Sequence, residues 1–501
     1  MSFIEHLAEA SKEINNLSVT ENGFAGYKTT GRAILDFFFK VASYKNNQEL
    51  LVKDFEAVLA EEKLEIAIAL SLYLRDVRGG QGQRASGRTV FHSLIDSGKL
   101  TAESIAKLIS LLPEYGRWDD VLSFVNHSVA GAMAKDLITA QLLKDMESDN
   151  PSLLGKWLPS INTSSRASVK LAHIIRKTLG WNSEKYRKAC VALRKKLAVV
   201  ETKMSAREWE SINYEHVPSV ANIRYKNAFE KHDGERRKEY LEKLAKGEAK
   251  IHGAVNYPHD IIARIRMEQK PISDSEHILY DKLWKELPRL KMEDTLTVVD
   301  VSGSMESVVS GSTTAMDVSI ALGLYTAESI KGEFHNKVVA FSERPVLCEV
   351  PESDIVDRWL AVKEIIWSMN TDMQAVFQLI LKTAVDKKLR QEDLPRQLLV
   401  VTDMEFDRAN DSNNGREPFQ KDFGIMEKEY SDAGYVMPKL VFWNVSSRTC
   451  TIPAVKPEVT LISGFSPVTL ELIANSVPIE QSILGVLGKP RYARGVQYVL
   501  N

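Results

Sequence analysis

The pattern of apolar residues changes once along this chain of 501 residues, close to Pro288. From about residue 30 to 285, apolar side chains recur at helical spacing in segments of about 10 to 25 residues, separated by Gly, Pro, Ser or Asn. After Pro288, short β-rich runs alternate with amphipathic segments. The sequence therefore predicts two architectures, an all-α domain over residues 1–288 and an α/β domain over residues 289–501.

The first of these regions has the pattern of consecutive helices with short connections and no strands. This arrangement favours an α-solenoid of HEAT-like helical repeats or an irregular bundle of paired helices. The helices are expected at residues 31–44, 49–74, 101–112, 119–127, 133–146, 165–179, 183–199 and 235–246.

The second region alternates strand and helix, which predicts a doubly wound, Rossmann-like parallel sheet covered on both faces. In such sheets ligands bind beyond the carboxyl ends of the strands. The strands are expected at residues 296–301, 337–341, 398–402, 439–445 and 458–462. The intervening helices are expected at residues 315–331, 355–367, 373–386 and 418–433.

Five oxygen-bearing side chains follow or lie near these strands and predict a divalent-cation site. The first strand ends in Asp300, with Ser302 and Ser304 at the next alternate positions, while Thr371 precedes a helix and Asp403 follows another strand. Carboxylates and hydroxyls are hard donors that suit Mg²⁺ or Mn²⁺. Because serine is neutral, the ion keeps much of its charge and can attract an anionic group from a partner.

Other interpretations of the same residues stay open. Asp300 and the serines could instead cap the following helix, or the site could have kept its ligands without binding metal. A hydrolase that uses the ion to activate water is the third alternative. An Asp-x-Asp phosphatase would need an acid at position 302, where Ser302 stands, and no Walker A, HExxH or Cys–His nucleophile pattern is found.

Basic residues concentrate locally, although the formal net charge of the whole chain is only −2. Residues 156–237 carry 18 Lys or Arg against 8 Asp or Glu. A second group of arginines surrounds a Gly-Gly-x-Gly turn, whose backbone NH groups could also hold an anion. Solvated helix faces are the alternative; the phosphate-binding interpretation selects Arg75, Arg78, Arg84, Arg88, Lys170, His173, Arg176, Lys177, Arg187 and Arg194.

The composition is that of a soluble protein in a reducing compartment, so a cytoplasmic location is expected. Cys190, Cys348 and Cys450 lie far apart with no CxxC spacing, and no apolar run is long enough to span a membrane.

Several short segments resemble those of a TROVE-like family with a C-terminal von Willebrand factor A (vWA) domain, related to the Ro 60 kDa RNA-binding autoantigen and found in plants, large DNA viruses, phages and bacteria. In the helical region they are residues 75–84 (RDVRGGQGQR), 115–120 (YGRWDD), 156–159 (KWLP), 186–187 (YR), 217–219 (VPS) and 228–233 (AFEKHD). In the α/β region they are residues 300–305 (DVSGSM), 369–372 (MNTD), 402–406 (TDMEF) and 442–444 (FWN).

The resemblance implies a metal-ion-dependent adhesion site formed by Asp300, Ser302, Ser304, Thr371 and Asp403. It also implies a monomeric ring of helices that binds small structured RNA and single-stranded RNA ends. The expected function is a non-enzymatic ribonucleoprotein scaffold. The alternative is a protein-interaction module whose metal captures an acidic residue of a partner, without RNA.

Overall fold

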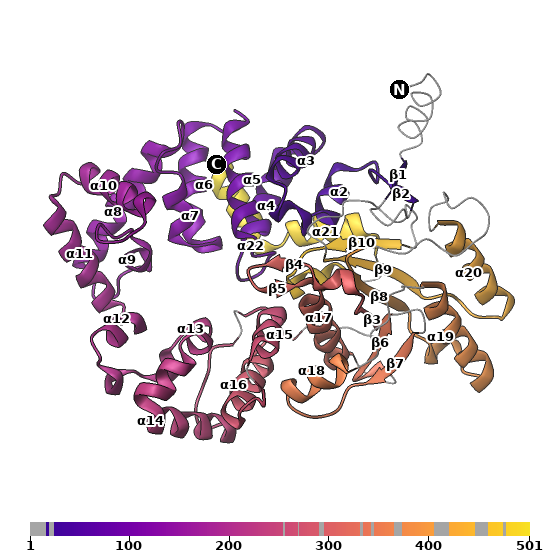
Figure 1. The fold of residues 1–501 in the computed structure, drawn as a ribbon. Coiled ribbons are helices and arrows are strands. Elements are labelled where there is room, and N and C mark those ends of the chain that lie inside the picture. The colour runs from indigo at the N-terminus through magenta and orange to yellow at the C-terminus, as the bar shows by residue number, and fades with distance from the viewer. Residues whose placement is uncertain are drawn as a thin grey trace, which may run out of the picture. The chain divides into compact units, whose positions relative to one another are not determined.

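The structure is a computed structural model, which describes residues 17–19, 25–253, 256–268, 270–289, 295–330, 334–341, 345–364, 373–404, 420–445, 459–473 and 477–501. The chain forms two compact units (Figure 1). Unit 1 consists of Met1–Glu62 and Gly253–Val486, and unit 2 of Lys63–His252 and Leu487–Asn501. Both sequence regions contribute to each unit, so the spatial units cross the boundary expected at residues 288 and 289.

Unit 1 is built on a six-stranded sheet with the strand order β10-β9-β8-β3-β6-β7. All neighbouring strands are parallel except β7, which pairs antiparallel with β6 at one edge. The strands are β3 (Thr295–Asp300), β6 (Lys337–Phe341), β7 (Val346–Glu349), β8 (Gln397–Thr402), β9 (Lys439–Asn444) and β10 (Val459–Ser463). The five strands expected from sequence are thus confirmed; β7 was not expected, because a short, mostly exposed edge strand lacks an apolar pattern.

Two small antiparallel pairs accompany this sheet. One joins β1 (Leu17–Val19) to β2 (Ala25–Tyr27). The other is a hairpin of β4 (Val308–Ser310) and β5 (Thr313–Thr314). The hairpin lies between β3 and the next helix, where no strand was expected from the sequence.

Alternate side chains of the sheet face different helices, as a buried parallel sheet requires. Leu296 and Val298 of β3 belong to a core cluster with residues of α19 (Met373–Lys387) and α20 (Gln420–Asp432). The opposite face packs against α17 (Ala315–Ser329), where Thr297 Oγ1 lies 2.7 Å from Thr326 Oγ1. This confirms a sheet covered on both faces.

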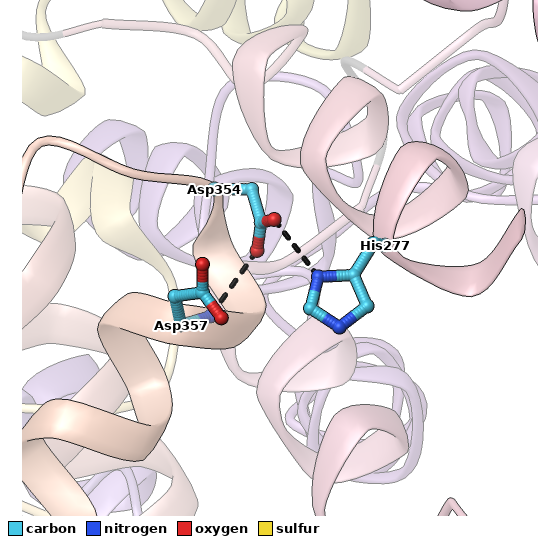
Figure 2. A group of neighbouring side chains, drawn as sticks. All are labelled: His277, Asp354 and Asp357. Atoms are coloured by element: carbon cyan, nitrogen blue, oxygen red, sulfur yellow. Dashed lines mark hydrogen bonds and ion pairs between the residues drawn. The ribbon is translucent and has the colours of Figure 1, made fainter. Parts of the chain in front are cut away.

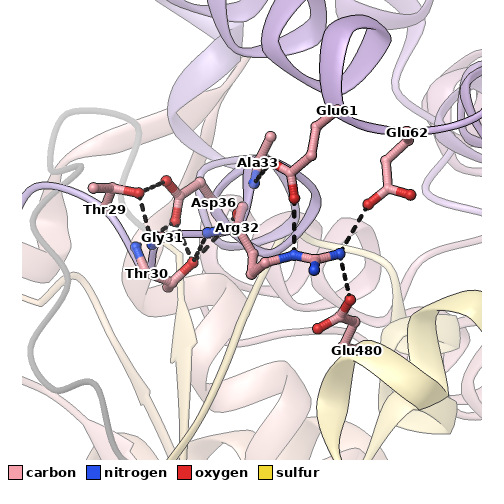
Figure 3. A network of polar contacts seen from close by, with 9 residues as sticks. All are labelled: Thr29, Thr30, Gly31, Arg32, Ala33, Asp36, Glu61, Glu62 and Glu480. Atoms are coloured by element: carbon pink, nitrogen blue, oxygen red, sulfur yellow. Dashed lines mark hydrogen bonds and ion pairs between the residues drawn. The ribbon is translucent and has the colours of Figure 1, made fainter.

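Helices from both ends of the sequence complete unit 1. Helix α15 packs on α17, α16 packs on α18, and α2 contacts β10. The entry into α2 is fixed by Arg32, which forms ion pairs with Glu61, Glu62 and Glu480 (Figure 3). The remaining helices of the unit are α2 (Ala33–Phe39), α3 (Gln48–Glu61), α15 (Pro258–Met267), α16 (Asp274–Lys285), α18 (Ile355–Lys363) and α21 (Ile479–Leu487), with 3₁₀ turns η1 (Ser43–Lys45), η4 (Gly303–Glu306), η6 (Gln391–Asp393) and η7 (Pro467–Leu472).

Unit 2 contains no strand among its described residues, which confirms the all-helical expectation for this part of the chain. Its last helix comes from the C-terminus and packs on α4 and α6. The helices are α4 (Leu64–Arg75), α5 (Arg84–Asp96), α6 (Ala102–Tyr115), α7 (Trp118–Ser123), α8 (Gly131–Glu147), α9 (Leu154–Trp157), α10 (Arg166–Thr178), α11 (Ser183–Lys196), α12 (Val200–Ser205), α13 (Ser219–Arg224), α14 (Lys226–Lys246) and α22 (Pro490–Leu500), with 3₁₀ turns η2 (Trp209–Ser211) and η3 (Tyr214–His216).

One predicted element is wrong. The single helix expected over residues 49–74 is divided into α3 and α4, because Glu62 and Lys63 adopt extended backbone angles. The helical spacing of apolar residues continues through this break, so periodicity alone does not reveal it. Among the helices that the structure describes, none is long and apolar enough to cross a membrane.

Candidate metal site and basic surfaces

Two buried carboxylates meet at the carboxyl ends of neighbouring strands. Asp300 is the last residue of β3, and Asp403 directly follows β8. The two strands pair in parallel with Val299 opposite Val401, so both acids lie at the same edge of the sheet. Asp300 is 1% exposed and Asp403 is 2% exposed. The structure thus brings together two of the five ligands expected from sequence.

The loop after β3 places the two serine hydroxyls beside each other. Ser302 Oγ lies 3.1 Å from Ser304 Oγ. Asp300 accepts the Ser302 backbone NH at 2.9 Å through Oδ1 and the Thr402 hydroxyl at 2.5 Å through Oδ2. Ser302 is buried, while Ser304 is half-buried. Asp300, Ser302 and Ser304 therefore form one set of oxygen donors at the sheet edge.

The electrostatics of this edge suit a cation. Burial, followed by the nearby charge of Asp403, raises the pKa of Asp300 to about 6, and hydrogen bonds from Thr402 and Ser302 oppose this rise. Two carboxylates removed from water at short range repel each other, and a divalent ion would relieve that cost. Carboxylate and hydroxyl oxygens are also the donors that Mg²⁺ and Mn²⁺ prefer. The donor set fits the ion expected from sequence; Thr371 lies outside the described residues.

The alternative explanation was that Asp300 and the two serines cap the following helix. In the structure another residue caps that helix. Helix α17 is capped by Thr314, whose Oγ1 accepts a hydrogen bond from the Asp317 backbone NH. The Asp317 carboxylate in turn accepts a hydrogen bond from the Thr314 backbone NH. The hairpin β4–β5 separates this cap from Ser302. Ser302 precedes the short turn η4 but makes no side-chain capping hydrogen bond. The serines are therefore not required to cap the helix.

A second cluster of candidate ligands, not selected from sequence, consists of His277, Asp354 and Asp357 (Figure 2). Asp354 caps α18 by accepting the backbone NH groups of Val356 and Asp357. Its other oxygen lies 2.8 Å from His277 Nδ1 on α16. The Asp354 carboxylate therefore caps α18 and also links α18 to α16 through His277.

The arginines around the Gly-rich turn are largely neutralised within unit 2. Arg75 is 1% exposed and its Nη2 lies 2.6 Å from Asp120. Arg88 contacts Asp120 at 2.6 Å and Asp119 at 2.9 Å, and Arg84 also pairs with Asp119. The prediction that Arg75 contacts RNA is wrong for this structure, because a buried guanidinium held by a buried carboxylate is not available to a ligand.

Backbone NH groups of the Gly-rich turn also form hydrogen bonds within unit 2. The NH of Gln81 donates to the Tyr73 carbonyl at 3.0 Å, and the NH of Gly82 donates to the Asp76 carbonyl at 3.1 Å. Arg78 donates to the carbonyl of Glu114 and has its own NH bound by Asp76. These NH groups therefore cannot form the anion nest expected from sequence.

The remaining predicted phosphate contacts lie on α10 and α11, and they divide into two groups. Lys170, Lys177 and Arg187 are exposed. Arg194 instead donates to the carbonyls of Gly155 and Leu158, which makes it a structural residue. Similarly, the half-buried Arg176 bonds to the Trp181 carbonyl and to His173.

The two helices α10 and α11 carry far more positive than negative charge. Together they contain 10 Lys or Arg and a single acid, Glu184. That acid pairs with Lys188, and both side chains are more than half exposed. Within the part of unit 2 that the structure describes, no other basic residue of these helices has an ion pair. We call the exposed set the α10–α11 basic surface: Arg166, Lys170, Lys177, Lys185, Arg187, Lys188, Lys195 and Lys196.

Comparisons with known proteins connect the chain to uncharacterised families. Residues 294–483 match the domain of unknown function DUF7788, and residues 177–296 match the domain of unknown function DUF2828. An uncharacterised protein of Acanthamoeba polyphaga mimivirus is 28% identical over 506 residues, covering 92% of this chain and 85% of the relative. The chain is also similar to the crystal structure of the RO (RSR) protein of Deinococcus radiodurans, with 14% identity, a TM-score of 0.44, and coverage of 91% of this chain and 93% of that one.

Proposed function

We propose that the protein is a non-enzymatic RNA-binding scaffold in which the α10–α11 basic surface holds the phosphate backbone. One observation carries this proposal: two adjacent helices contain 10 basic residues and one acid. Eight of these basic side chains are exposed, and only Lys188 has an ion-pair partner among the described residues. A protein of net charge −2 that leaves such a surface without counter-charges favours a polyanionic ligand.

Helix α14 of unit 2 has a different charge pattern from α10 and α11. Helix α14 also contains many lysines, but acids are interspersed among them. Lys243 of α14, for example, pairs with Glu239 at 2.7 Å. Solvated faces of this mixed kind need no ligand, whereas the surface on α10 and α11 repels itself unless anions cover it.

The test measures binding of a small RNA hairpin with single-stranded ends at two salt concentrations. Alanine replaces four exposed lysines of the α10–α11 basic surface, namely Lys170, Lys177, Lys188 and Lys195. We expect at least a tenfold loss of affinity at low salt, because each lysine removed costs a phosphate contact. The dependence of affinity on salt should also fall by up to about 3.6 in log–log slope, at roughly 0.7 to 0.9 per contact.

A matched control removes the same charge from another helix of the same unit. Lys231, Lys238, Lys243 and Lys246 on α14 are also exposed. Alanine at these four positions should change affinity less than threefold. Equal losses in the two variants, or no binding of RNA by the wild-type protein at low salt, would overturn the proposal.

We further propose a second function for unit 1, as a vWA-like domain with a metal-dependent docking site. Asp300, Asp403, Ser302 and Ser304 support it, because buried acids and paired hydroxyls form a set of hard oxygen donors. The ion would be Mg²⁺ or Mn²⁺, with its outer position open to a carboxylate or phosphate. Direct titration with Mn²⁺, followed by electron paramagnetic resonance, tests the site: Asp300→Asn should abolish binding, and equal binding by both proteins would remove the proposal.

A further inference from the structure

Three segments far apart in sequence come together at one place in unit 2. The start of α5 supplies Arg84, the start of α7 follows Arg117, and α9 ends at Trp157. The guanidinium carbon of Arg117 lies 5.4 Å from the centre of the Trp157 ring, and that of Arg84 lies 5.7 Å from it. We call these three residues the Arg–Trp cluster.

The charges around this cluster do not balance. Four guanidinium groups gather here, from Arg75, Arg84, Arg88 and Arg117, against the two carboxylates of residues 119 and 120. The buried Arg75 and the three-quarters buried Arg88 take up Asp120 between them. Of the two outer arginines, Arg84 shares Asp119 with Arg88, so the excess positive charge falls mainly on Arg117 and is only partly offset at Arg84.

Arg117 is the least compensated member. Its side chain forms no ion pair with any acid in the described part of unit 2, although its backbone NH donates to Asp120 at 2.8 Å. Burial, then the charges of Arg75 and Arg84, lowers the pKa of Arg117. An anion placed between the two outer guanidiniums would remove this repulsion.

The tight packing behind the cluster explains how it is held. A Cβ atom at Gly116 would collide with the Asp120 carboxylate and come within 3.0 Å of the Arg75 guanidinium. Only glycine lets the chain before Arg117 approach this buried ion pair so closely. The interior pair of Arg75 and Asp120 thus acts as a rigid base, and Arg84 and Arg117 are exposed above it.

We propose that the Arg–Trp cluster is a nucleotide subsite for single-stranded RNA. The phosphate would bind the two outer guanidiniums, which fit phosphate oxygens with two donors each. The base would stack on the half-exposed ring of Trp157. This inference rests on the proposed function, and it names a second contact that selects unpaired nucleotides, because a base inside a duplex cannot stack on a side chain.

The experiment uses the full-length protein and three probes of known chemistry. They are a labelled ten-nucleotide oligouridylate, an abasic ribose-phosphate strand of the same length, and a blunt RNA duplex. Trp157→Ala should lower the affinity for oligouridylate about tenfold and should change the affinity for the duplex less than twofold. The abasic strand should bind more weakly than oligouridylate to the wild type and should not respond to Trp157→Ala.

Two further variants keep the result interpretable. The double variant Arg84→Gln with Arg117→Gln changes exposed side chains, so it remains informative if Trp157→Ala unfolds. It should lower the salt slope for oligouridylate by about 0.7, the value for one phosphate on a single strand. Trp209→Ala removes another half-exposed tryptophan of unit 2, far from these segments in sequence, and should leave oligouridylate binding within twofold.

The outcomes separate this inference from the proposed function. One outcome is that the four-lysine variant loses all RNA binding while Trp157→Ala binds RNA as tightly as the wild type. This result would overturn the proposed subsite but would still support RNA binding through α10 and α11. Equal affinity of the wild type for the abasic strand and for oligouridylate would also overturn the subsite. The subsite would likewise be overturned if a phosphorylated peptide bound the Arg–Trp cluster and oligouridylate did not. Failure of every RNA probe to bind wild-type protein would instead reject the proposed function.

Discussion

Arg491, in the last helix of the chain, holds both carboxylate oxygens of Asp76, 415 residues earlier, at 2.6 and 2.9 Å. Asp76 is fully buried, and Tyr492 adds a third bond to it at 3.1 Å. Tyr115 in turn donates its hydroxyl to the Arg491 carbonyl at 2.6 Å. Helix α22 is therefore part of the core of unit 2, although the rest of that unit ends at residue 252.

Removal of this arginine should strongly destabilise unit 2. Arg491→Ala leaves the buried carboxylate of Asp76 without its ion-pair partner, a change that typically costs about 3 to 5 kcal/mol of unfolding free energy. Thermal or urea unfolding of the full chain would measure it. Arg494→Ala on the same helix is the control, because among the described residues the Arg494 side chain bonds only to the Pro490 carbonyl of its own helix. Similar stability of the two variants would contradict the role assigned to the pair.

Replacement of Gly116 by alanine should also destabilise unit 2, by at least about 2 kcal/mol, because the new methyl group collides with the Asp120 carboxylate. Gly98→Ala is an informative comparison. Gly98 has a φ of +70° but nothing within 4 Å of an added Cβ, so its cost is backbone strain alone, about 1 kcal/mol. Equal unfolding free energies for the two variants would show that the Asp120 contact does not constrain position 116.

Mg²⁺ should raise the melting temperature of unit 1 in wild-type protein. An ion that binds only the folded state stabilises it by about 2.7 kcal/mol at a concentration one hundred times its dissociation constant. Differential scanning calorimetry with Mg²⁺ and with EDTA would measure the shift. Asp403→Asn should remove the shift, whereas Asp354→Asn, in the cluster of Figure 2, should retain it. The opposite pattern would move the cation site to His277, Asp354 and Asp357.

Acid should destabilise unit 1 through His259 on α15. This residue is 7% exposed, stacks on Tyr257 at 5.3 Å between ring centres, and meets Phe465 edge-on. Burial lowers the pKa of His259, an effect opposed by the charges of Asp260 and Asp317 and reinforced by Lys45. Because the unfolded chain then binds the proton more strongly, stability is present above about pH 6.5 and is lost as pH falls toward the lowered pKa.

Measurement of the unfolding free energy between pH 7.5 and 5.5 tests this sign. Wild-type protein should lose stability over this window, and His259→Phe should lose less. The exposed His252→Gln should behave as wild type. An identical pH dependence in wild type and His259→Phe would rule out His259 as the source of acid sensitivity.

The strands of unit 1 could be predicted from sequence because each buried strand is a short apolar run. Leu398 to Val401 are all buried between helix layers, and the run ends at the polar residues that reach the sheet edge. The convergence of Asp300 and Asp403 follows from the same logic, since parallel neighbours end at one edge. The hairpin β4–β5 could not be predicted, because its strands of three and two residues are too short to show a period.

The arginines of the Gly-rich turn illustrate the opposite case. Sequence alone shows Arg75, Arg84 and Arg88 with one acid nearby, so they look unpaired. Their partners, Asp119 and Asp120, lie more than 30 residues away along the chain, and only folding brings them to these arginines. Local charge counts cannot include partners that tertiary contacts bring in.

The sequence by itself determined the helical and α/β regions, the strand ends that carry Asp300 and Asp403, and the excess of positive charge on α10 and α11. These features depend on local periodicity and composition, which the chain carries without folding. Only the tertiary structure decided which positive charges are neutralised and which helices form each unit, because ion pairs such as Arg491–Asp76 join residues that folding alone brings within 3 Å. The energies of burial and of ion pairing depend on distances in three dimensions. The separation of two residues along the chain does not reveal these distances.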